Sequence, residues 1–367
     1  MSSKQGASVT PIATAEIQAG CSHHSQSPPS DHPAEWSASA SLKPPPLPYL
    51  PGACFDIKPH NPPPPLGPGY HKPDPKEWIE NPWPFGKGSP DTIIDQHLAH
   101  PPRKTTPPTY QSPRCLQVTH QIRCGDPCMA QVVRCRVDGT DLVAKIFDPL
   151  YVGIDEGYGF PPTYYSERFY SCEAAAYKRI KERGLDGRYT PGFMGCWFLE
   201  LPLPAGKGRV VRREIRLILQ EFVPGDNMRA IMERGEADKI DPQVRMELLD
   251  RLMEGLSQLD FIGVLHDDLH PRNLMVSKGA KNGYEITLID FSHPRVQDLP
   301  NSKFRTRRKK KLPESPITIT GSCWPPNCSD WIPKEYDGRT EVSFEKRLDS
   351  MKKRWEKSDQ YEPVNYE

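Results

Sequence analysis

The sequence predicts an α+β fold in which a five-stranded antiparallel sheet carrying one helix is followed by a mainly helical region. Two observations indicate this order. Between residues 115 and 223, apolar and β-branched runs alternate with turn residues, and one stretch has helical spacing. Between residues 224 and 300, the strongest pattern is a leucine stripe that repeats at helical spacing.

The strand pattern occurs in five segments of the first region. Asp138-Gly139 separates the second segment from the third, and this dipeptide between two apolar runs is typical of a tight hairpin. The five segments are residues 116–122, 131–137, 142–147, 193–199 and 215–222.

One helix is expected between the third and fourth strands. Cys172, Ala175, Ala176 and Ile180 form an apolar stripe at helical spacing, and Gly184 supplies a stop signal after it. The polar and aromatic residues 148–168 are expected to be an insertion before this helix.

The second region begins after Val223-Pro224-Gly225, which breaks the strand pattern. Asp241-Pro242 predicts a helix start, since an aspartate caps the first turn and proline fits the first helical position. Leucines and Met253 then recur at helical spacing as far as Gly263. Residues 274–276 and 284–289 predict a short hairpin.

The chain before Cys115 has a different composition. It holds 25 of the 43 prolines, and such a segment buries too little apolar surface to offset its ordering entropy. We therefore predict that residues 1–114 are a largely disordered, Pro-rich tail. Within it, Leu47-Pro48-Tyr49 could dock into an SH3- or WW-type groove that recognises polyproline helices, and the alternative is a solvated tail without a specific partner.

Charge and cysteine content exclude several classes of protein. A net charge of +1 makes nucleic acid an improbable partner. No run of 18 apolar residues and no N-terminal signal pattern is present, so we expect no membrane span and an intracellular location, cytoplasmic or nuclear. The ten cysteines are read as reduced thiols, and the pairs Cys124/Cys128 and Cys323/Cys328 do not match the spacing of a metal site.

The most informative motif is His266-Asp267-Asp268-Leu269-His270-Pro271-Arg272-Asn273, followed by Ile289-Asp290-Phe291-Ser292. Asp268 precedes Asn273 by five residues and Asp290 by twenty-two. Phosphoryl transfer from a nucleotide needs one carboxylate that orients a hydroxyl, and an amide and a second carboxylate that hold Mg²⁺. The spacing therefore predicts a phosphoryl-transfer site.

This motif resembles the catalytic loop and metal element of the protein kinase superfamily, H-x-D-x-x-x-x-N followed by D-F-G. The resemblance implies a two-lobed protein-kinase-like fold, with a five-stranded small lobe at 115–223 and a reduced, mainly helical large lobe at 224–300. It implies ATP and Mg²⁺ as cofactors, Asp268 as the catalytic base or hydroxyl-orienting group, and Asn273 and Asp290 as metal ligands. His266 is expected to orient the loop by hydrogen bonding.

The same resemblance assigns roles in the first region. Lys145 would contact the α- and β-phosphates and form an ion pair with Glu173. The backbone of Glu221 and Val223 would bind the adenine edge. A kinase has several glycines in the loop between the first two strands, whereas this chain keeps only Gly125 at the corresponding place.

Several readings of the function follow. The leading one is an ATP-dependent phosphotransferase that transfers the γ-phosphate to a protein Ser or Thr hydroxyl. The Asp268-Leu-His-Pro-x-Asn273 loop is also similar to aminoglycoside and choline phosphotransferases, which act on small hydroxyl compounds. A pseudokinase scaffold that binds nucleotide or a partner without turnover is the second alternative, because the glycines are missing and the C-terminal region is short. A nucleic-acid or chromatin adaptor is the third.

The last segment, residues 301–367, contains a basic run at 305–311, a Pro-rich stretch and one expected helix. The basic run is consistent with a nuclear import signal or an anion-binding patch, and equally with a solvated loop. Phe344, Leu348, Met351 and Trp355 would line one side of the helix and dock it on the preceding region.

Overall fold

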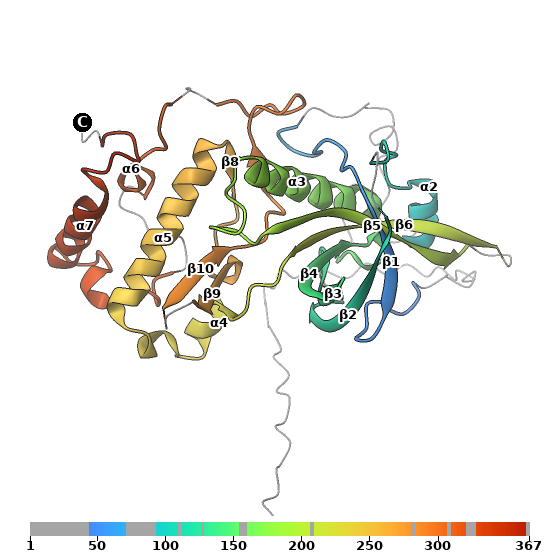
Figure 1. Cartoon of the computed structure of the whole chain (residues 1–367), viewed down its shortest axis with the longest axis horizontal. Coiled ribbons are helices and arrows are strands. Elements are labelled where there is room, and N and C mark those ends of the chain that lie inside the picture. Colours follow the sequence, from blue (N-terminus) through green and yellow to red (C-terminus); the bar gives the residue numbers. More distant parts are fainter. Residues whose placement is uncertain are drawn as a thin grey trace, which may run out of the picture. The chain divides into compact units, whose positions relative to one another are not determined.

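The computed structural model describes residues 44–70, 93–108, 112–125, 128–153, 160–205, 209–279, 283–306, 310–320 and 328–364 (Figure 1). Six antiparallel strands close into a barrel in the order β1-β2-β3-β4-β6-β5. The strands are β1 (Cys54–Pro59), β2 (Arg114–Arg123), β3 (Gln131–Val137), β4 (Thr140–Phe147), β5 (Phe193–Pro204) and β6 (Val210–Glu221). Alternating side chains fill the inside of the barrel, and Val133, Ala144 and Leu217 are fully buried there.

The predicted two-lobed protein-kinase-like fold, with an open five-stranded small lobe and a mainly helical large lobe, is wrong. The five expected strands are present as β2 to β6, but β1 pairs with both β2 and β5 and closes the sheet on itself. Among the described residues, the region after the barrel has few helices and two small sheets rather than a helical lobe.

β1 lies inside the segment that was predicted to be a disordered tail. Residues 44–70 and 93–108 of that segment are ordered, and they form β1 and α2 (Ile93–Ala99). The prediction of disorder from proline content fails for these residues, because they bury their apolar side chains on the barrel rather than on one another. Ile57 and Tyr49 are fully buried in the barrel cluster. Residues 1–43 and 71–92 lie outside the described residues.

The Pro-rich stretch next to Tyr49 also contacts the barrel. The Tyr151 hydroxyl donates hydrogen bonds to the carbonyl oxygens of Pro45 and Pro46, at 2.7 and 3.1 Å. Leu47 packs against the barrel cluster, and the Tyr49 hydroxyl donates to Asp148 at 2.6 Å. Neither alternative for this stretch, a partner's groove or a solvated tail, describes the structure, in which the chain's own barrel holds it.

The predicted hairpin between β3 and β4 is confirmed. Val137 pairs with Thr140, so Asp138 and Gly139 form a two-residue turn, and both have positive φ. A two-residue turn of this kind matches the right-handed twist of the flanking strands.

Helix α3 (Pro162–Glu182) lies against the barrel and contains the predicted apolar stripe (Figure 1). It begins earlier than expected, because residues 162–168 of the expected insertion form its first turns. Tyr170, Ala174, Tyr177 and Ile180 are fully buried in a cluster that also includes residues from the second region. Gly184 ends the helix in a left-handed conformation, as the sequence predicted.

The second region begins with β7 (Asp226–Asn227), α4 (Met228–Glu233) and the predicted helix α5 (Pro242–Phe261). The Asp241 carboxylate caps α5 by accepting from two backbone N–H groups. The predicted hairpin is present as β9 (Leu274–Lys278) and β10 (Tyr284–Leu288), which form a sheet with β7. Short strands β8 (Val264–Leu265) and β11 (Arg295–Val296) pair with each other.

Gly225 is the residue that lets the chain leave the barrel and approach β9 closely. Its φ is +107°, and a Cβ atom there would lie 2.2 Å from the carbonyl oxygen of Val276. Any larger residue would displace the β7 pairing with β9, and this pairing positions the end of the loop that contains Asn273.

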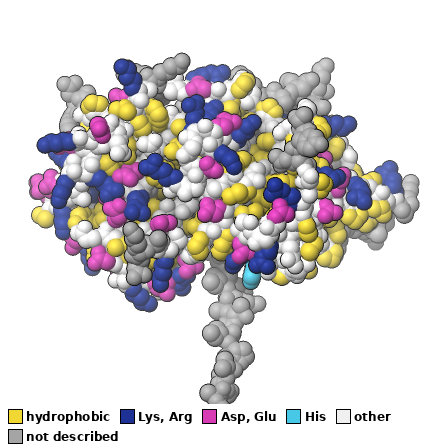
Figure 2. Space-filling model, in the orientation of Figure 1, with side chains coloured by type: hydrophobic (Ala, Val, Ile, Leu, Met, Phe, Trp, Pro, Cys, Tyr) yellow, Lys and Arg dark blue, Asp and Glu magenta, His cyan; other side chains and the backbone are white. Residues whose placement is uncertain are grey.

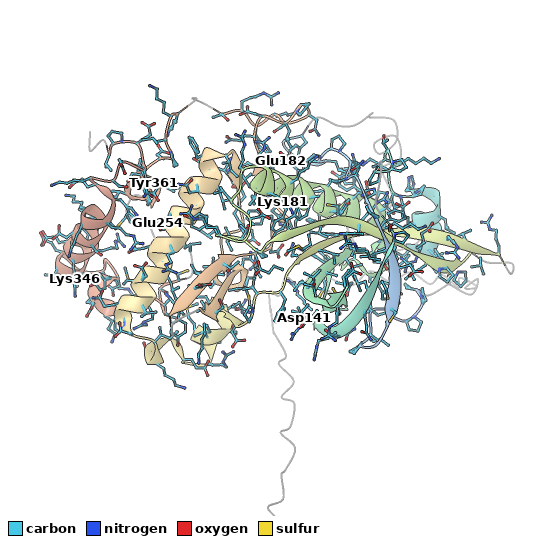
Figure 3. All side chains as sticks on the ribbon, viewed as in Figure 1. Asp141, Lys181, Glu182, Glu254, Lys346 and Tyr361 are labelled. Carbon is cyan, nitrogen blue, oxygen red and sulfur yellow. The ribbon has the colours of Figure 1, made fainter. Side chains whose placement is uncertain are left out.

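The C-terminal helix α7 (Glu341–Trp355) was expected to dock on the preceding region, and it packs on α5 through only part of the predicted stripe. Met351 and Trp355 are buried against Met253, whereas Phe344 is exposed. Three carboxylates of α5 form ion pairs with the guanidinium of one α7 residue, Arg354. They belong to Glu247, Asp250 and Glu254. One of the three, Glu254, is labelled in Figure 3.

None of the described helices combines the length and the apolar composition needed to cross a membrane. On the face shown in Figure 2, Lys and Arg side chains alternate with Asp and Glu side chains. Residues 307–309 of the predicted basic run lie outside the described residues.

Candidate functional site

Lys145 joins three elements at the edge of the barrel. It lies in β4, between Val132 of β3 and Ile218 of β6. Its Nζ atom lies 2.6 Å from Glu173 Oε2 on α3 and 2.6 Å from Asp290 Oδ1, which follows β10. The ion pair between Lys145 and Glu173 that the sequence led us to expect is present, and Asp290 adds a second carboxylate to it.

Burial and charge act in opposite directions in this group. Burial alone would lower the pKa of Lys145, but the carboxylates of Asp290 and Glu173 outweigh it and raise that pKa. Burial raises the pKa of Glu173 to about 7 although Lys145 is beside it. Burial would also raise the pKa of Asp290, yet Lys145 and the Ser292 hydroxyl hold it below the usual range. Asp290 is therefore the carboxylate that keeps its negative charge near neutral pH.

The backbone at Asp290 has an uncommon conformation that neighbouring side chains hold in place. Asp290 has a φ of 65°, a left-handed conformation that is uncommon for residues other than glycine. The Ser292 hydroxyl donates to Asp290 Oδ1 at 2.7 Å, and the Phe291 ring is fully buried against Tyr177 and His266. Serine at the position where a kinase has the glycine of D-F-G thus fixes the aspartate.

His266 connects the two halves of the sequence motif. Its Nε2 donates to the carbonyl oxygen of Ile289 at 2.9 Å, and its Nδ1 accepts from the backbone N–H of Asp268 at 3.3 Å. Burial lowers the pKa of His266, so the ring is neutral and can make both contacts. His266 thus makes hydrogen bonds of the kind through which it was expected to orient the loop.

Asp268 and Asn273 contact each other directly. Asn273 Nδ2 donates to Asp268 Oδ2 at 3.0 Å and to the Asp268 carbonyl oxygen at 2.8 Å. Arg272 Nη2 donates to both carboxylate oxygens of Asp268, at 2.9 and 3.0 Å. The backbone N–H of Ile289 donates to the Asn273 carbonyl oxygen at 2.9 Å, which ties this loop to the Asp290 segment.

The oxygen donors present fit a magnesium ion that also binds phosphate. Asp290 Oδ2 and Asn273 Oδ1 accept no hydrogen bond from other described residues, so both are available as ligands. No group of three or more His, Cys, Asp or Glu side chains could hold a metal among the described residues. Magnesium typically takes one or two carboxylates and completes its octahedron with phosphate and water.

The neighbouring acid, Asp267, does not take part in this group. Its carboxylate is bound by the Arg295 guanidinium through two hydrogen bonds, one of them 2.7 Å long. The two adjacent aspartates therefore have different partners, and Asp268 is the one that contacts Asn273.

Some of the backbone groups that were predicted to contact a nucleotide already form hydrogen bonds within the protein. The N–H of Gly125 donates to the Gln131 side chain at 2.6 Å, and the next residues, 126 and 127, lie outside the described residues. The N–H of Glu221 donates to the carbonyl oxygen of Gly192 at 2.8 Å. Val223 makes no backbone hydrogen bond with other described residues, so its groups could meet an adenine edge.

Sequence reasoning missed three side chains of this site. Ser292 and Gln220, whose amide contacts Glu173 at 3.4 Å, are placed by the fold and carry no local signal. Arg272 is four residues from Asp268, but the two are joined by an irregular loop and a short 3-10 helix (Pro271–Asn273), so the contact has no local sequence signal.

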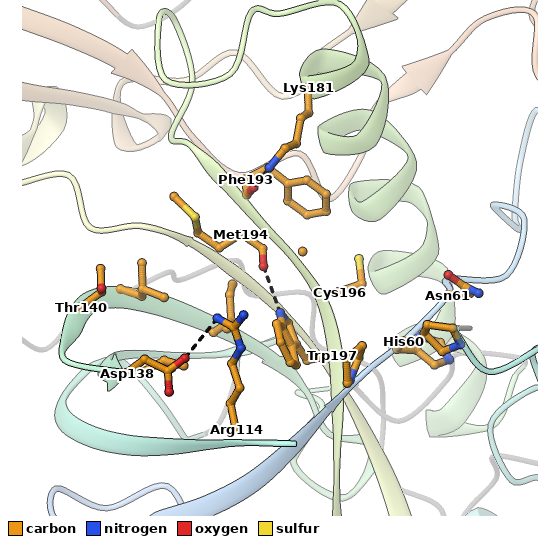
Figure 4. Close-up of a pocket in the computed structure, with 16 residues that line it drawn as sticks. His60, Asn61, Arg114, Asp138, Thr140, Lys181, Phe193, Met194, Cys196 and Trp197 are labelled. Atoms are coloured by element: carbon orange, nitrogen blue, oxygen red, sulfur yellow. Dashed lines mark hydrogen bonds and ion pairs between the residues drawn. The ribbon is translucent and has the colours of Figure 1, made fainter. Parts of the chain in front are cut away.

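A separate cavity of about 630 Å³ opens beside β5 (Figure 4). Trp197 Nε1 donates to the Met194 carbonyl oxygen at 3.0 Å at its wall, and Arg114 pairs with Asp138 at 3.2 Å. None of the residues that line it is Lys145 or belongs to the 266–292 motif, so this cavity is not the candidate site.

Comparison with known proteins gives limited support. No protein-family model matches the chain. Over 79 residues, the chain is 33% identical to the serine/threonine-protein kinase pkn2 of Myxococcus xanthus, a match that covers 22% of this chain and 9% of that kinase. The similarity supports a relationship to protein kinases at most.

Proposed function

We propose that this chain binds Mg²⁺-ATP and transfers the γ-phosphate to a hydroxyl group, with a protein Ser or Thr side chain as the acceptor. One observation carries the proposal: Lys145 contacts both Glu173 and Asp290, while Asp290 is tied through His266 and Ile289 to the Asp268–Asn273 pair. The proposal rests on these side chains and not on the fold, because one chemistry recurs on unrelated folds.

Lys145 supplies the positive charge for the nucleotide. Its Nζ atom is held by two carboxylates, and one of them, Asp290, is a quarter exposed. A triphosphate next to this edge would meet a charged lysine that is already oriented, so little reorganisation is needed.

Asn273 and Asp290 would hold Mg²⁺ through the two oxygens that accept no hydrogen bond from other described residues. The ion would neutralise charge on the phosphates and orient them. Lys145 would then share Asp290 with the metal, and the pKa of that aspartate is already low enough for it to be ionised.

Asp268 orients the acceptor. In the transfer, the acceptor oxygen forms a bond to the γ-phosphorus while the bond from that phosphorus to the β–γ bridging oxygen breaks, which gives ADP. The hydroxyl proton passes to the Asp268 carboxylate and then to solvent. Asn273 Nδ2 fixes the carboxylate for this role by its 3.0 Å hydrogen bond.

A scaffold that binds nucleotide without turnover is the second candidate. Two contacts favour it: the Gly125 N–H is used by Gln131 and cannot also hold a phosphate, and Arg272 covers the Asp268 carboxylate. A measurement of phosphate transfer distinguishes the scaffold from the phosphotransferase, whereas nucleotide binding alone does not.

The test is the thermal stability of the full chain with millimolar ATP, with and without Mg²⁺. A ligand that binds only the folded state at about 100 times its Kd adds roughly 2.7 kcal/mol of stability, so the melting temperature should rise by several degrees. Asp290→Asn should remove the Mg²⁺-dependent rise. Asparagine tolerates the left-handed backbone at this position, whereas alanine would add strain.

Asp267→Asn is the matched control, because it neutralises the adjacent carboxylate that Arg295 binds. It should leave the rise intact. Absence of any rise with Mg²⁺-ATP in the wild type would end the proposal. Where binding is present, Asp268→Ala should cut phosphate transfer by orders of magnitude while nucleotide affinity stays the same; binding without any transfer would favour the scaffold.

A further inference from the structure

The contact between Arg272 and Asp268 has no role in the proposed transfer, and it occupies the group that must receive the acceptor. One guanidinium nitrogen of Arg272 donates to both carboxylate oxygens of Asp268. A carboxylate has about four acceptor positions. With Asn273 on a third, little of the Asp268 carboxylate is left for a hydroxyl.

Arg272 can leave this position at small cost. Its side chain is 43% exposed, and its partner is 29% exposed. Exposed ion pairs of this kind contribute little to stability, because solvent screens the charges and the side chains lose freedom when they pair. Among the described residues, the Arg272 side chain has no other hydrogen-bond partner that would hold it in place.

Other cations lie around the same carboxylate. Burial and then Arg272 and Arg229 lower the pKa of His270, whereas Asp268 raises it, so these groups lie within electrostatic reach of one another. Burial and then Arg168 lower the pKa of His293. Arg168 comes from α3 and Arg229 from α4.

Most of the acidic groups nearby already have partners. Arg295 binds Asp267, Lys145 binds Asp290, and Glu233 pairs with Arg229 at 2.7 Å. The basic partners of these acids are thereby paired as well, and Arg272 is the exposed cation that contacts the Asp268 carboxylate.

We propose that Arg272 is a specificity-determining residue, which releases Asp268 and binds an anionic group of the acceptor close to the hydroxyl that is phosphorylated. This inference rests on the proposed function. The acceptor would be a Ser or Thr with acidic neighbours in the chain, and neutral or basic sequences would leave Arg272 on Asp268.

The position of Arg272 favours the acceptor over the nucleotide as the source of the anion. It contacts Asp268, where the hydroxyl would lie, whereas the nucleotide phosphates are assigned to Lys145 and Asp290. An anion that takes Arg272 away from Asp268 both frees the carboxylate and places its own hydroxyl beside it.

The experiment uses the full chain with Mg²⁺-ADP and two fluorescent peptides that contain one serine. The peptides are identical except that three glutamates in one replace three lysines in the other. In fluorescence polarisation, the glutamate peptide should bind roughly 10-fold more tightly, since complementary charge favours one partner and like charge rejects the other. Arg272→Gln should abolish the preference, and Arg272→Lys should keep part of it.

Arg251→Gln is the matched control, because Arg251 is also an exposed arginine paired with a glutamate four residues away. It should keep the full preference. In phosphate transfer from Mg²⁺-ATP, Arg272→Gln should raise KM for the glutamate peptide with a smaller change in kcat, which a loss of loop structure would not do.

Four results would overturn the inference: equal binding of the two peptides, no binding of either peptide, a preference that survives Arg272→Gln, or a loss of nucleotide affinity larger than the loss of peptide affinity. The last would assign Arg272 to the phosphates. Failure of the proposed function is separate, because it is read from the Mg²⁺-ATP thermal shift without any peptide.

Discussion

Two charged clusters lie along the same strand, β4. They differ in how many of their hydrogen-bonding groups have partners within the protein. Asp148 follows the end of β4 and binds Arg213 and Tyr49. Lys145 lies three residues earlier and binds Glu173 and Asp290. Both clusters tie distant parts of the chain to the barrel, but only one of them is open to solvent.

The Asp148 cluster is closed. Its carboxylate accepts from the Tyr49 hydroxyl at 2.6 Å, from the Leu150 N–H at 3.1 Å, and from the Arg213 guanidinium. The side chains of Asp148 and Arg213 are 0% and 2% exposed. Both carboxylate oxygens accept hydrogen bonds inside the protein and neither side chain is open to solvent, so this cluster fixes the ordered N-terminal segment.

The Lys145 cluster is closed on one side only. Glu173 is fully buried, whereas Asp290 is 25% exposed and offers one oxygen that accepts no hydrogen bond from other described residues. Charged groups are therefore buried in this cluster although one carboxylate oxygen of Asp290 accepts no hydrogen bond from the described residues. The oxygen that accepts no hydrogen bond is the difference between the two clusters on which our proposal of a site at Lys145 is based.

The largest effect should come from breaking the closed cluster. Asp148→Asn leaves the Arg213 guanidinium buried without a counter-charge, which should cost roughly 3–5 kcal/mol of unfolding free energy. Urea denaturation measures this loss. Any thermal shift with Mg²⁺-ATP should keep its size in the variant; a variant of unchanged stability would show that the cluster is not structural.

The second effect should come from the open cluster. Lys145→Met removes the charge assigned to the nucleotide and should reduce phosphate transfer by roughly 10²–10³-fold, the typical cost of losing one oriented electrostatic group. Its loss of stability should be smaller than that of Asp148→Asn, because Glu173 has a pKa of about 7 and can take up a proton instead of staying charged. Lys145→Met and Asp148→Asn should therefore transfer phosphate at different rates per folded molecule. Equal rates would show that the two clusters do not differ in function.

Sequence alone predicted the elements that have local patterns. The strands β2 to β6 alternate in burial or carry apolar runs, and Asp138-Gly139 marks the turn between two of them. Barrel closure has no local pattern. β1 has six residues, lies between prolines, and becomes a strand only because β2 and β5 both offer it an edge.

The contacts of the candidate site also divide into those that local sequence predicts and those that depend on the fold. The pairing of Asp268 with Asn273 follows from a short loop, and that of Lys145 with Glu173 follows from the order of elements. The hydrogen bond that occupies the Gly125 N–H could not be predicted, because it depends on where the Gln131 side chain points after the hairpin folds. Under the proposed function, specific contacts of this kind would decide how tightly a nucleotide is held.

The most gradual effect is a pH dependence that belongs to the open cluster. Burial raises the pKa of Glu173 from 4.5 to about 7 in the folded chain. Between these values the folded state keeps a proton that the unfolded state has lost, so unfolding free energy should fall as pH rises, by at most about 1.4 kcal/mol per pH unit. Below pH 4.5 and above pH 7 this contribution should no longer change.

Glu173→Gln should flatten the curve in this window, as measured by urea denaturation from pH 4.5 to 8. Asp250 is the matched control on α5, because burial also raises its pKa to about 7. Asp250→Asn should remove a contribution of similar slope without affecting Mg²⁺-ATP binding, whereas Glu173→Gln should weaken that binding by loosening Lys145. Parallel stability curves for wild type and Glu173→Gln would mean that Glu173 stays ionised, and that Lys145 is held equally by both carboxylates rather than mainly by Asp290.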